Sequence, residues 1–292
     1  MAPVDARKGA GLNNGVRMAE EPRSELVSDL QDYTDPPVAE VALGVQFRPL
    51  YGLRAIDLAD LRERWRAEYP LIQEQPYQAP VVEAAGVAQT SVQFVLGPQT
   101  TWRLWFLSED QSALVQLQHD RLGFNWRKPN VGDKAYPRYD YVRAGFERRW
   151  ADMADFVAEH KLGPLEITQV EVNYVNAIDF GPDNLGELER LLRVWRGTPQ
   201  HHLGNPEQAR LMMVFRVPGV GRDPVRMYVQ ADPAQLPDGT PGLFLTITVR
   251  GAAPDGSVQR ALDFMDRAHP HIVTSFDELT TDAMHALWGR KS

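Results

Sequence analysis

Residues 112–128 read SALVQLQHDRLGFNWRK, and two alternating apolar segments meet in this stretch at the polar pair His119-Asp120. Apolar residues take every second position on both sides of the pair: Val115, Leu117, Leu122, Phe124 and Trp126. A period of two is typical of strands buried on one face, and a two-residue break with Asp suits a hairpin. Residues 101–107 alternate in the same way, so the sequence predicts three consecutive strands in an antiparallel meander.

The composition limits the fold and the partner classes. The chain has 292 residues, enough for one large domain or two small ones, and its 43% hydrophobic content is ample for a packed core. The formal net charge is -8, so the field of the whole molecule would repel a phosphate backbone. Lys and Arg form no run longer than two residues, as at Arg148-Arg149. Nucleic acid is therefore the least favoured partner.

The chain has no Cys, which excludes disulfides, thiolate metal sites and a Cys nucleophile. Residues 1–15 lack the apolar segment of a secretory signal. No apolar run approaches the roughly 20 residues that span a bilayer. We therefore expect a cytoplasmic protein that makes no membrane contact.

The first part of the chain predicts a polar arm and then alternating strands and helices. Residues 1–35 are polar, have no sustained period and end in Asp35-Pro36-Pro37, which favours a disordered or loosely docked N-terminal arm. The expected elements that follow are a strand over 38–47, a helix that begins after Asp57, strands within 81–96, the meander, and a long helix from Tyr139 to Val157.

The second part repeats this order. A long strand is expected over 167–178, a short helix after Asn184, and further strands over 211–217, 225–230 and 243–250. A closing helical region begins at Ser257, and Pro270 is expected to kink it or divide it in two. The sequence therefore predicts an α+β fold of two pseudo-repeated halves, 36–164 and 165–292. Each half would be a curved antiparallel sheet with a long helix packed on it, in a saddle-like or helix-grip-like arrangement.

A set of short motifs extends over Pro36–Gly289. Its members are Pro36-Pro37 with Glu40-Val41, Phe124–Arg127, Tyr136-Pro137, Phe146 with Trp150, Asn173–Asn176, Phe276, Thr281-Asp282 and Leu287–Gly289. With these motifs the chain resembles a sporadically distributed family of uncharacterised bacterial proteins. The resemblance implies no activity, cofactor or catalytic residue, because none is established for that family.

Two strand segments supply candidate binding residues. Asn125, Trp126 and Arg127 end a strand, where an indole face and a guanidinium could hold an anionic or planar group. The alternative is that Trp126 continues the core face of its strand and that Arg127 is a solvated end.

The second candidate segment lies on the long strand that opens the second half. Asn173, Tyr174 and Asn176 could line a groove with hydrogen-bonding groups. A sheet face exposed to solvent would give the same pattern of residues. We expect the ligand-binding or partner-binding residues to come from these two segments.

Signatures of metal binding and catalysis are weak. His201-His202, the pair His269 and His271, and His285 lie at no recognisable ligand spacing, so no metal or cofactor is expected. The sequence contains no nucleophile-elbow, dinucleotide-binding or P-loop motif.

These observations favour a non-catalytic binding or adaptor protein that recognises a partner protein, a peptide or a small ligand through a groove of the sheet. Exposed sheet edges would allow strand addition by a partner. The sporadic distribution of the similar family suits a role in bacterial defence or conflict. The alternative is a hydrolase-like enzyme of unrecognised class with a site between the halves. A pocket holding ionisable groups with shifted pKa values would favour the enzyme.

Overall fold

The computed structural model describes residues 30–83, 102–129, 135–179, 188–196, 202, 209–236, 239–253 and 255–291. Residues Gln31–Ser292 form one compact unit. The fold of this unit is α+β, as predicted, and its described residues include nine strands in one antiparallel sheet. The strands expected over 81–96 and most of the N-terminal arm lie largely outside the described residues. The short helix expected after Asn184 is described from Leu188 onward and is present as the helix Leu188–Leu191.

The nine strands are β1 (Val38–Phe47), β2 (Leu71–Gln75), β3 (Arg103–Leu107), β4 (Ala113–Gln118), β5 (Arg121–Arg127), β6 (Ile167–Asp179), β7 (Leu211–Arg216), β8 (Arg222–Gln235) and β9 (Pro241–Ala252). Their order in the sheet is β2-β3-β4-β5-β1-β6-β9-β8-β7, and every neighbouring pair is antiparallel. The sheet is centred on the pair β1 and β6, which joins the two parts of the chain.

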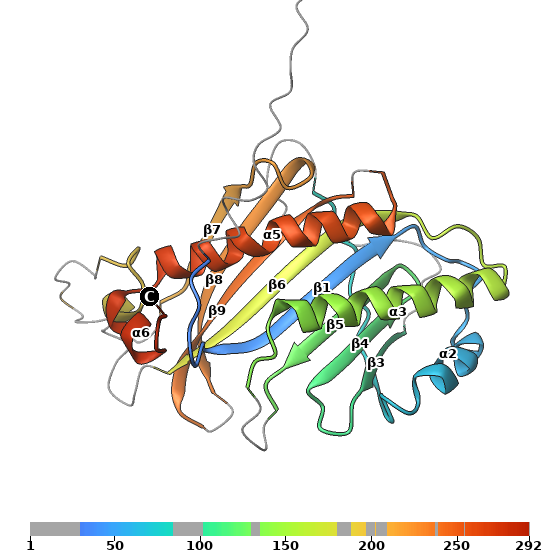
Figure 1. Ribbon diagram of the computed structural model, residues 1–292, viewed down its shortest axis with the longest axis horizontal. Coiled ribbons are helices and arrows are strands. Elements are labelled where there is room, and N and C mark those ends of the chain that lie inside the picture. The colour runs from blue at the N-terminus through green and yellow to red at the C-terminus, as the bar shows by residue number, and fades with distance from the viewer. Residues whose placement is uncertain are drawn as a thin grey trace, which may run out of the picture. The chain divides into compact units, whose positions relative to one another are not determined.

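The helical elements are the 3₁₀ turn η1 (Ala55–Asp57) and the α-helices α2 (Leu58–Trp65), α3 (Tyr139–Glu159), α4 (Leu188–Leu191), α5 (Val258–Leu279) and α6 (Asp282–Leu287). The long helices α3 and α5 lie on the same face of the sheet (Figure 1). Helix α3 packs on β5 and β1, and α5 packs on β6 and β9. We call this side of the sheet the covered face.

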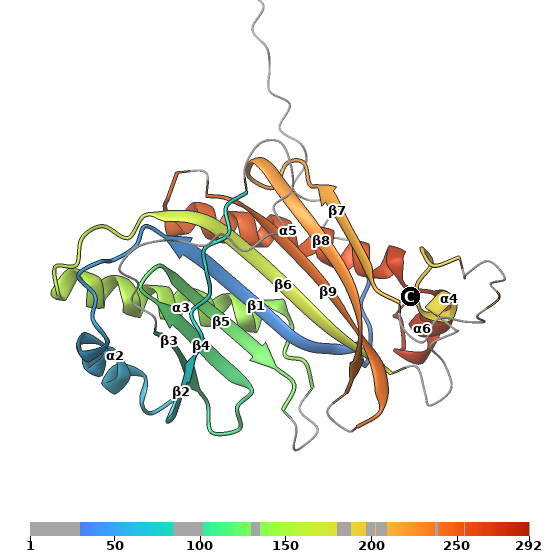
Figure 2. The same cartoon turned by 180° about the vertical axis from the view of Figure 1, so that it is seen from behind.

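The alternation of residues along each strand decides which side chains enter the core. In β1 the side chains of Leu43 and Val45 are buried against the helices, whereas Gly44 and Gln46 lie on the opposite face. No described helix lies on that opposite face, which is seen toward the viewer in Figure 2. We call it the open face. An extended segment of the chain, residues 76–83, crosses it, and we call this segment the strap.

Several sequence predictions are confirmed at the level of elements. The meander is formed by β3, β4 and β5, and the predicted long helix is α3. Pro270 does not divide the closing helix, because α5 continues through it and the separate helix α6 begins only at Asp282. None of the described helices is both long and apolar enough to span a bilayer.

Candidate functional site

Two glycines form the floor of a cavity at the centre of the open face. Gly44 of β1 is paired directly with Gly123 of β5, and the cavity above them has a volume of about 170 Å³. A Cβ on Gly44 would lie 3.6 Å from the Leu122 carbonyl oxygen, and one on Gly123 would lie 3.5 Å from the Leu43 carbonyl oxygen. Both are ordinary contacts, and neither glycine has a positive φ. The backbone conformation therefore does not require glycine at either position, and the lack of side chains leaves the cavity open.

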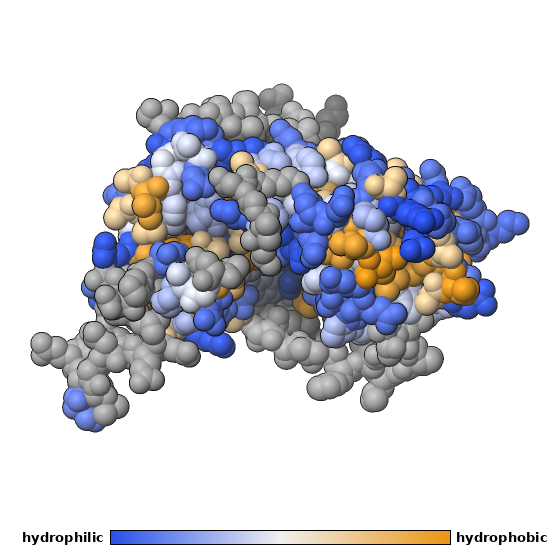
Figure 3. Space-filling view, turned by 90° about the horizontal axis from the view of Figure 1, so that it is seen from below, coloured by the Kyte–Doolittle hydropathy of each residue, from blue (hydrophilic) through white to orange (hydrophobic). Residues whose placement is uncertain are grey.

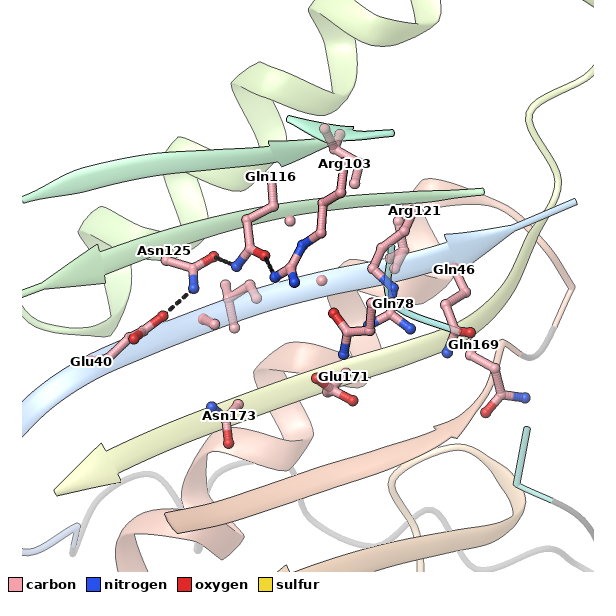
Figure 4. Close-up of a pocket in the computed structure, with 16 residues that line it drawn as sticks. Glu40, Gln46, Gln78, Arg103, Gln116, Arg121, Asn125, Gln169, Glu171 and Asn173 are labelled. Carbon is pink, nitrogen blue, oxygen red and sulfur yellow. Dashed lines mark hydrogen bonds between the residues drawn. The ribbon is translucent and has the colours of Figure 1, made fainter. Parts of the chain in front are cut away.

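Polar side chains line the cavity, which we call the open-face pocket (Figure 4). Six of them are amides: Gln46, Gln78, Gln116, Asn125, Gln169 and Asn173. Four are ionisable: Glu40, Arg103, Arg121 and Glu171. They come from β1, β3, β4, β5 and β6 and from the strap, so the pocket draws on both parts of the chain.

A chain of hydrogen bonds fixes one wall of the pocket (Figure 4). Arg103 donates from Nη2 to Oε1 of Gln116, whose Nε2 donates to Oδ1 of Asn125 over 2.9 Å. Asn125 in turn donates from Nδ2 to the Glu40 carboxylate. Each amide uses its carbonyl oxygen as acceptor and its NH₂ group as donor, so the orientation of both amides is determined. This wall presents fixed groups to the cavity.

The two carboxyl groups of the pocket have opposite pKa shifts. Burial raises the pKa of Glu40, although the hydrogen bond from Asn125 opposes this change. Burial also acts to raise the pKa of Glu171, but the charges of Arg250 and Arg121 and the hydrogen bond from Arg250 hold it below its usual value. Glu171 is therefore an ion-paired carboxylate, and Glu40 is the carboxyl group that more readily keeps its proton.

Glutamine side chains hold the strap against the open face. Gln46 donates to the Val81 carbonyl oxygen and accepts from the Val81 N–H, both over 2.9 Å. Gln118 pairs in the same two-way manner with the backbone of Gln78, at 2.9 and 3.0 Å. A primary amide offers one acceptor and two donors, so it can replace a neighbouring strand as partner of an extended backbone. The strap thereby forms one side of the pocket.

The last residue of the described strap is anchored by charge. Arg226 donates to the Glu83 carboxylate over 2.5 Å, and Tyr228 donates to it over 2.8 Å. Arg250 lies 3.6 Å away as a further ion-pair partner. The side chains of Glu83 and Arg226 are 0% and 3% exposed. A buried carboxylate with these partners is well satisfied and needs no ligand to explain it.

The residues singled out from the sequence lie on both faces of the sheet. Asn125 and Asn173 line the open-face pocket. Arg127 is on the open face at the end of β5, with its guanidinium 5.3 Å from the Trp105 ring centre, but it does not line the pocket. The six candidates therefore do not converge on one site.

The other three candidates lie on the covered side. Trp126 packs in the core with its ring centre 5.2 Å from that of Tyr136. The Tyr174 hydroxyl lies 2.9 Å from Nδ1 of His269 on α5. The buried Asn176 donates to the Leu245 carbonyl oxygen of β9 over 3.1 Å.

Residue type and alternation could have indicated more of the pocket. Gln116, Arg121, Gly123 and Asn125 all occupy alternate positions opposite the apolar residues of the β4–β5 hairpin. The sequence pattern does not indicate the two glycines, because a glycine in an alternating strand has neither a polar nor an apolar side chain. The contribution of the strap depends on contacts distant in sequence, which no local pattern shows.

Some of the exposed apolar residues lie at the two edges of the sheet, whereas others, such as Tyr51, Ile56 and Leu287, do not. Leu71 and Ile72 of the edge strand β2 are partly exposed, as are Met212, Val214 and Phe215 of the opposite edge strand β7. Seen from below, hydrophobic residues gather toward the side where α2 lies (Figure 3). Among the described residues, no strand pairs with the outer side of β2 or of β7.

In the part of the chain that the structure describes, no group of three or more His, Asp or Glu side chains could hold a metal ion. In comparisons with known proteins, no family model, no curated protein and no solved structure matches this chain.

Proposed function

We propose that this chain is a binding protein that holds a small polar ligand in the open-face pocket. The observation that carries the proposal is the pair Gly44 and Gly123, which keeps a hollow open in the middle of the sheet under polar walls. Glycine in a strand interior weakens the strand and often marks a place where a ligand approaches the backbone closely. The neighbouring walls offer amide groups whose orientation is already fixed, which lowers the ordering cost of binding.

The size and chemistry of the pocket restrict the ligand. Sites for drug-sized molecules usually have volumes of about 300–1,000 Å³. A volume of about 170 Å³ therefore suits a smaller molecule, or one part of a larger molecule or peptide. Because the walls are mostly amides, the ligand should carry several hydrogen-bonding groups. We propose Asn125 and Asn173 as direct contacts.

The test is a binding screen with a pocket-filling variant. Pooled amino acids, sugars, nucleosides and carboxylic acids would be tested by thermal shift, and each hit by calorimetric titration. The double variant Gly44→Ala, Gly123→Ala places two methyl groups on the pocket floor and should weaken binding about tenfold or more. Gly52→Ala is the matched control, because Gly52 is exposed and does not line the pocket. Binding of no pooled compound, or equal binding by the double variant, would contradict the proposal.

A second candidate function is catalysis on the bound ligand, with Glu40 as proton donor. It is favoured by the raised pKa of this partly buried carboxyl group, since groups with shifted pKa values in a cavity are common at active sites. A hydrolase-like reaction would then take place where the two parts of the chain meet. Chromatography of the ligand after incubation decides this point. The enzyme model expects a new product with the wild type and none with Glu40→Gln, which should still bind.

We also propose that the two parts of the chain are structural repeats. Outward from β1 the sheet order is β5, β4, β3, and outward from β6 it is β9, β8, β7. In each part the first strand and the last strand are neighbours, and a long helix on the covered face follows the last strand. This arrangement would place an approximate twofold axis between β1 and β6, beside the open-face pocket.

A further inference from the structure

Arg121 lines the open-face pocket, and two of its nitrogen atoms have no hydrogen-bond acceptor among the described residues. Its Nε and Nη2 atoms are buried, and no described residue accepts a hydrogen bond from either. Arg103, which lines the same pocket, also has a buried Nε without a partner. Figure 4 shows both side chains reaching over β1. A buried cationic donor without an acceptor is costly, so it needs an explanation.

Glu171 and Asp120 act on Arg121 through their charge, but the hydrogen bonds that they accept come from other residues. Glu171 accepts a hydrogen bond from Nε of Arg250 over 2.5 Å. Asp120 accepts from the Tyr77 hydroxyl and from Gln118, both over 3.1 Å. No described carboxylate lies within 4.0 Å of the Arg121 guanidinium. The described residues therefore give Arg121 neighbouring negative charge but no hydrogen-bond acceptor for its Nε and Nη2 atoms.

The two arginines also affect each other. Burial lowers the pKa of both guanidinium groups, and the charge of Arg121 lowers the pKa of Arg103 further. Two like charges that face one cavity repel each other. An anion placed between them would relieve this repulsion and accept from the free N–H groups, and the guanidinium fork matches the oxygens of carboxylate and phosphate.

We propose that the ligand of the open-face pocket carries an anionic group, a carboxylate or a phosphate, that binds to the guanidinium groups of Arg121 and Arg103. This inference rests on the proposed function of the pocket. The rest of the ligand lies along the wall formed by Gln116 and Asn125, which offers both donors and acceptors. The ligand is thus a small organic acid or phosphate ester with further polar groups.

The experiment titrates inorganic phosphate and succinate separately into the wild type in a buffer of low chloride content. At least one of the two should bind, and its identity assigns the anionic group to the phosphate or the carboxylate class. Arg121→Gln should weaken this binding by about tenfold to a hundredfold, because charge-assisted hydrogen bonds are lost. Arg62→Gln removes an exposed arginine of α2 and should bind as the wild type does. The inference is overturned if neither anion binds, or if Arg121→Gln binds equally well.

A second measurement, thermal unfolding, distinguishes loss of binding from misfolding of the variant. Arg121→Gln also removes the attraction between this charge and Glu171, so the variant is first shown to unfold cooperatively without any anion. The anion should then raise the unfolding temperature of the wild type and leave that of the variant unchanged. The outcome that separates the two proposals is a neutral compound whose binding depends on Gly44 and Gly123 but not on Arg121. It would overturn the inference and leave the proposed function standing. If no compound of any charge bound in a glycine-dependent manner, both would fall.

Discussion

Glycine has two different roles in this fold, and the distances from a hypothetical Cβ atom to its neighbours distinguish them. Gly44 and Gly123 face an open cavity, where an added methyl group would make only ordinary contacts. Gly145 of α3 lies against the ring of Phe124, and a Cβ there would be 2.3 Å from Cε1 of that ring. The first pair keeps space for a ligand, whereas Gly145 allows a helix to approach the sheet.

The first prediction concerns Gly145→Ala. Alanine would improve helix propensity by about 1 kcal/mol, but forcing a methyl group into the Phe124 ring costs about 1–3 kcal/mol or more. Since the contact is far inside the van der Waals limit, we expect the cost to dominate and the free energy of unfolding to fall. Urea unfolding measures this change, with Gly44→Ala as a variant of nearly wild-type stability. A Gly145→Ala protein at least as stable as the wild type would show that α3 does not approach β5 this closely.

At the scale of elements, His269 connects α5 to the rest of the core. Its ring stacks on that of Tyr139 in α3 at 4.2 Å, and Nδ1 lies 2.9 Å from the Tyr174 hydroxyl in β6. Burial lowers the pKa of His269 from 6.5 to about 4, although Asp266 opposes the change. The folded protein therefore keeps this ring neutral at pH values where the unfolded chain is protonated.

The second prediction follows from this difference in protonation. Between pH 6.5 and about 4 the unfolded chain binds a proton that the folded chain does not, so stability is lost as the pH falls through this window. The loss should be on the order of 3 kcal/mol. His269→Asn should reduce the pH dependence of the free energy of unfolding. The control variant His160→Asn keeps His269 and should therefore keep this pH dependence. The measurement is urea unfolding from about pH 7 to pH 4. An equally steep loss in His269→Asn would refute the assignment.

The strap supplies the third prediction. Glu83 is the carboxylate partner of the buried Arg226, and removing one member of a buried ion pair costs about 3–5 kcal/mol. Glu83→Gln should therefore lower the free energy of unfolding by roughly this amount. Glu74→Gln changes an exposed carboxylate of β2 and should stay within about 0.5 kcal/mol of the wild type. If both variants unfolded at the wild-type urea concentration, the strap would not be anchored by this ion pair.

At the scale of the whole molecule, the two parts of the chain meet through the antiparallel pair β1 and β6. The proposed repeat architecture predicts that each part keeps its own strand order and long helix. Residues 31–164 and 165–292, expressed together as separate chains, should therefore associate into a complex with the circular dichroism spectrum of the intact protein. Each fragment alone would expose an edge strand, β1 or β6, and should aggregate. Two fragments that each remain monomeric when mixed would contradict this architecture.

Local sequence patterns predicted many of the individual strands and helices, but not how distant strands pair in the sheet. The period of two in residues 112–128 and the three-to-four spacing in α3 identified the hairpin and the helix, because both signals lie within one element. The pairing of β1 with β6 joins residues far apart in sequence, and no local pattern reports it.

The candidate site was predicted only in part, for a physical reason. Trp126 and Tyr174 were predicted as binding residues. The alternation of side chains along their strands places both in the core, where each contacts Tyr136. Asn125 was predicted together with Trp126 and Arg127 at the end of a strand, and Asn173 was predicted as a hydrogen-bonding group on the long strand; both line the pocket.

The most direct test of the account is a nuclear magnetic resonance titration of the side-chain NH₂ groups with a compound that binds in the screen. The open-face pocket predicts that the signals of Asn125 and Asn173 shift, because both side chains line it. The signal of Asn176 should stay in place, because its amide donates to the Leu245 carbonyl oxygen on the covered side. Shifts at Asn176 without shifts at Asn125 and Asn173 would contradict the account.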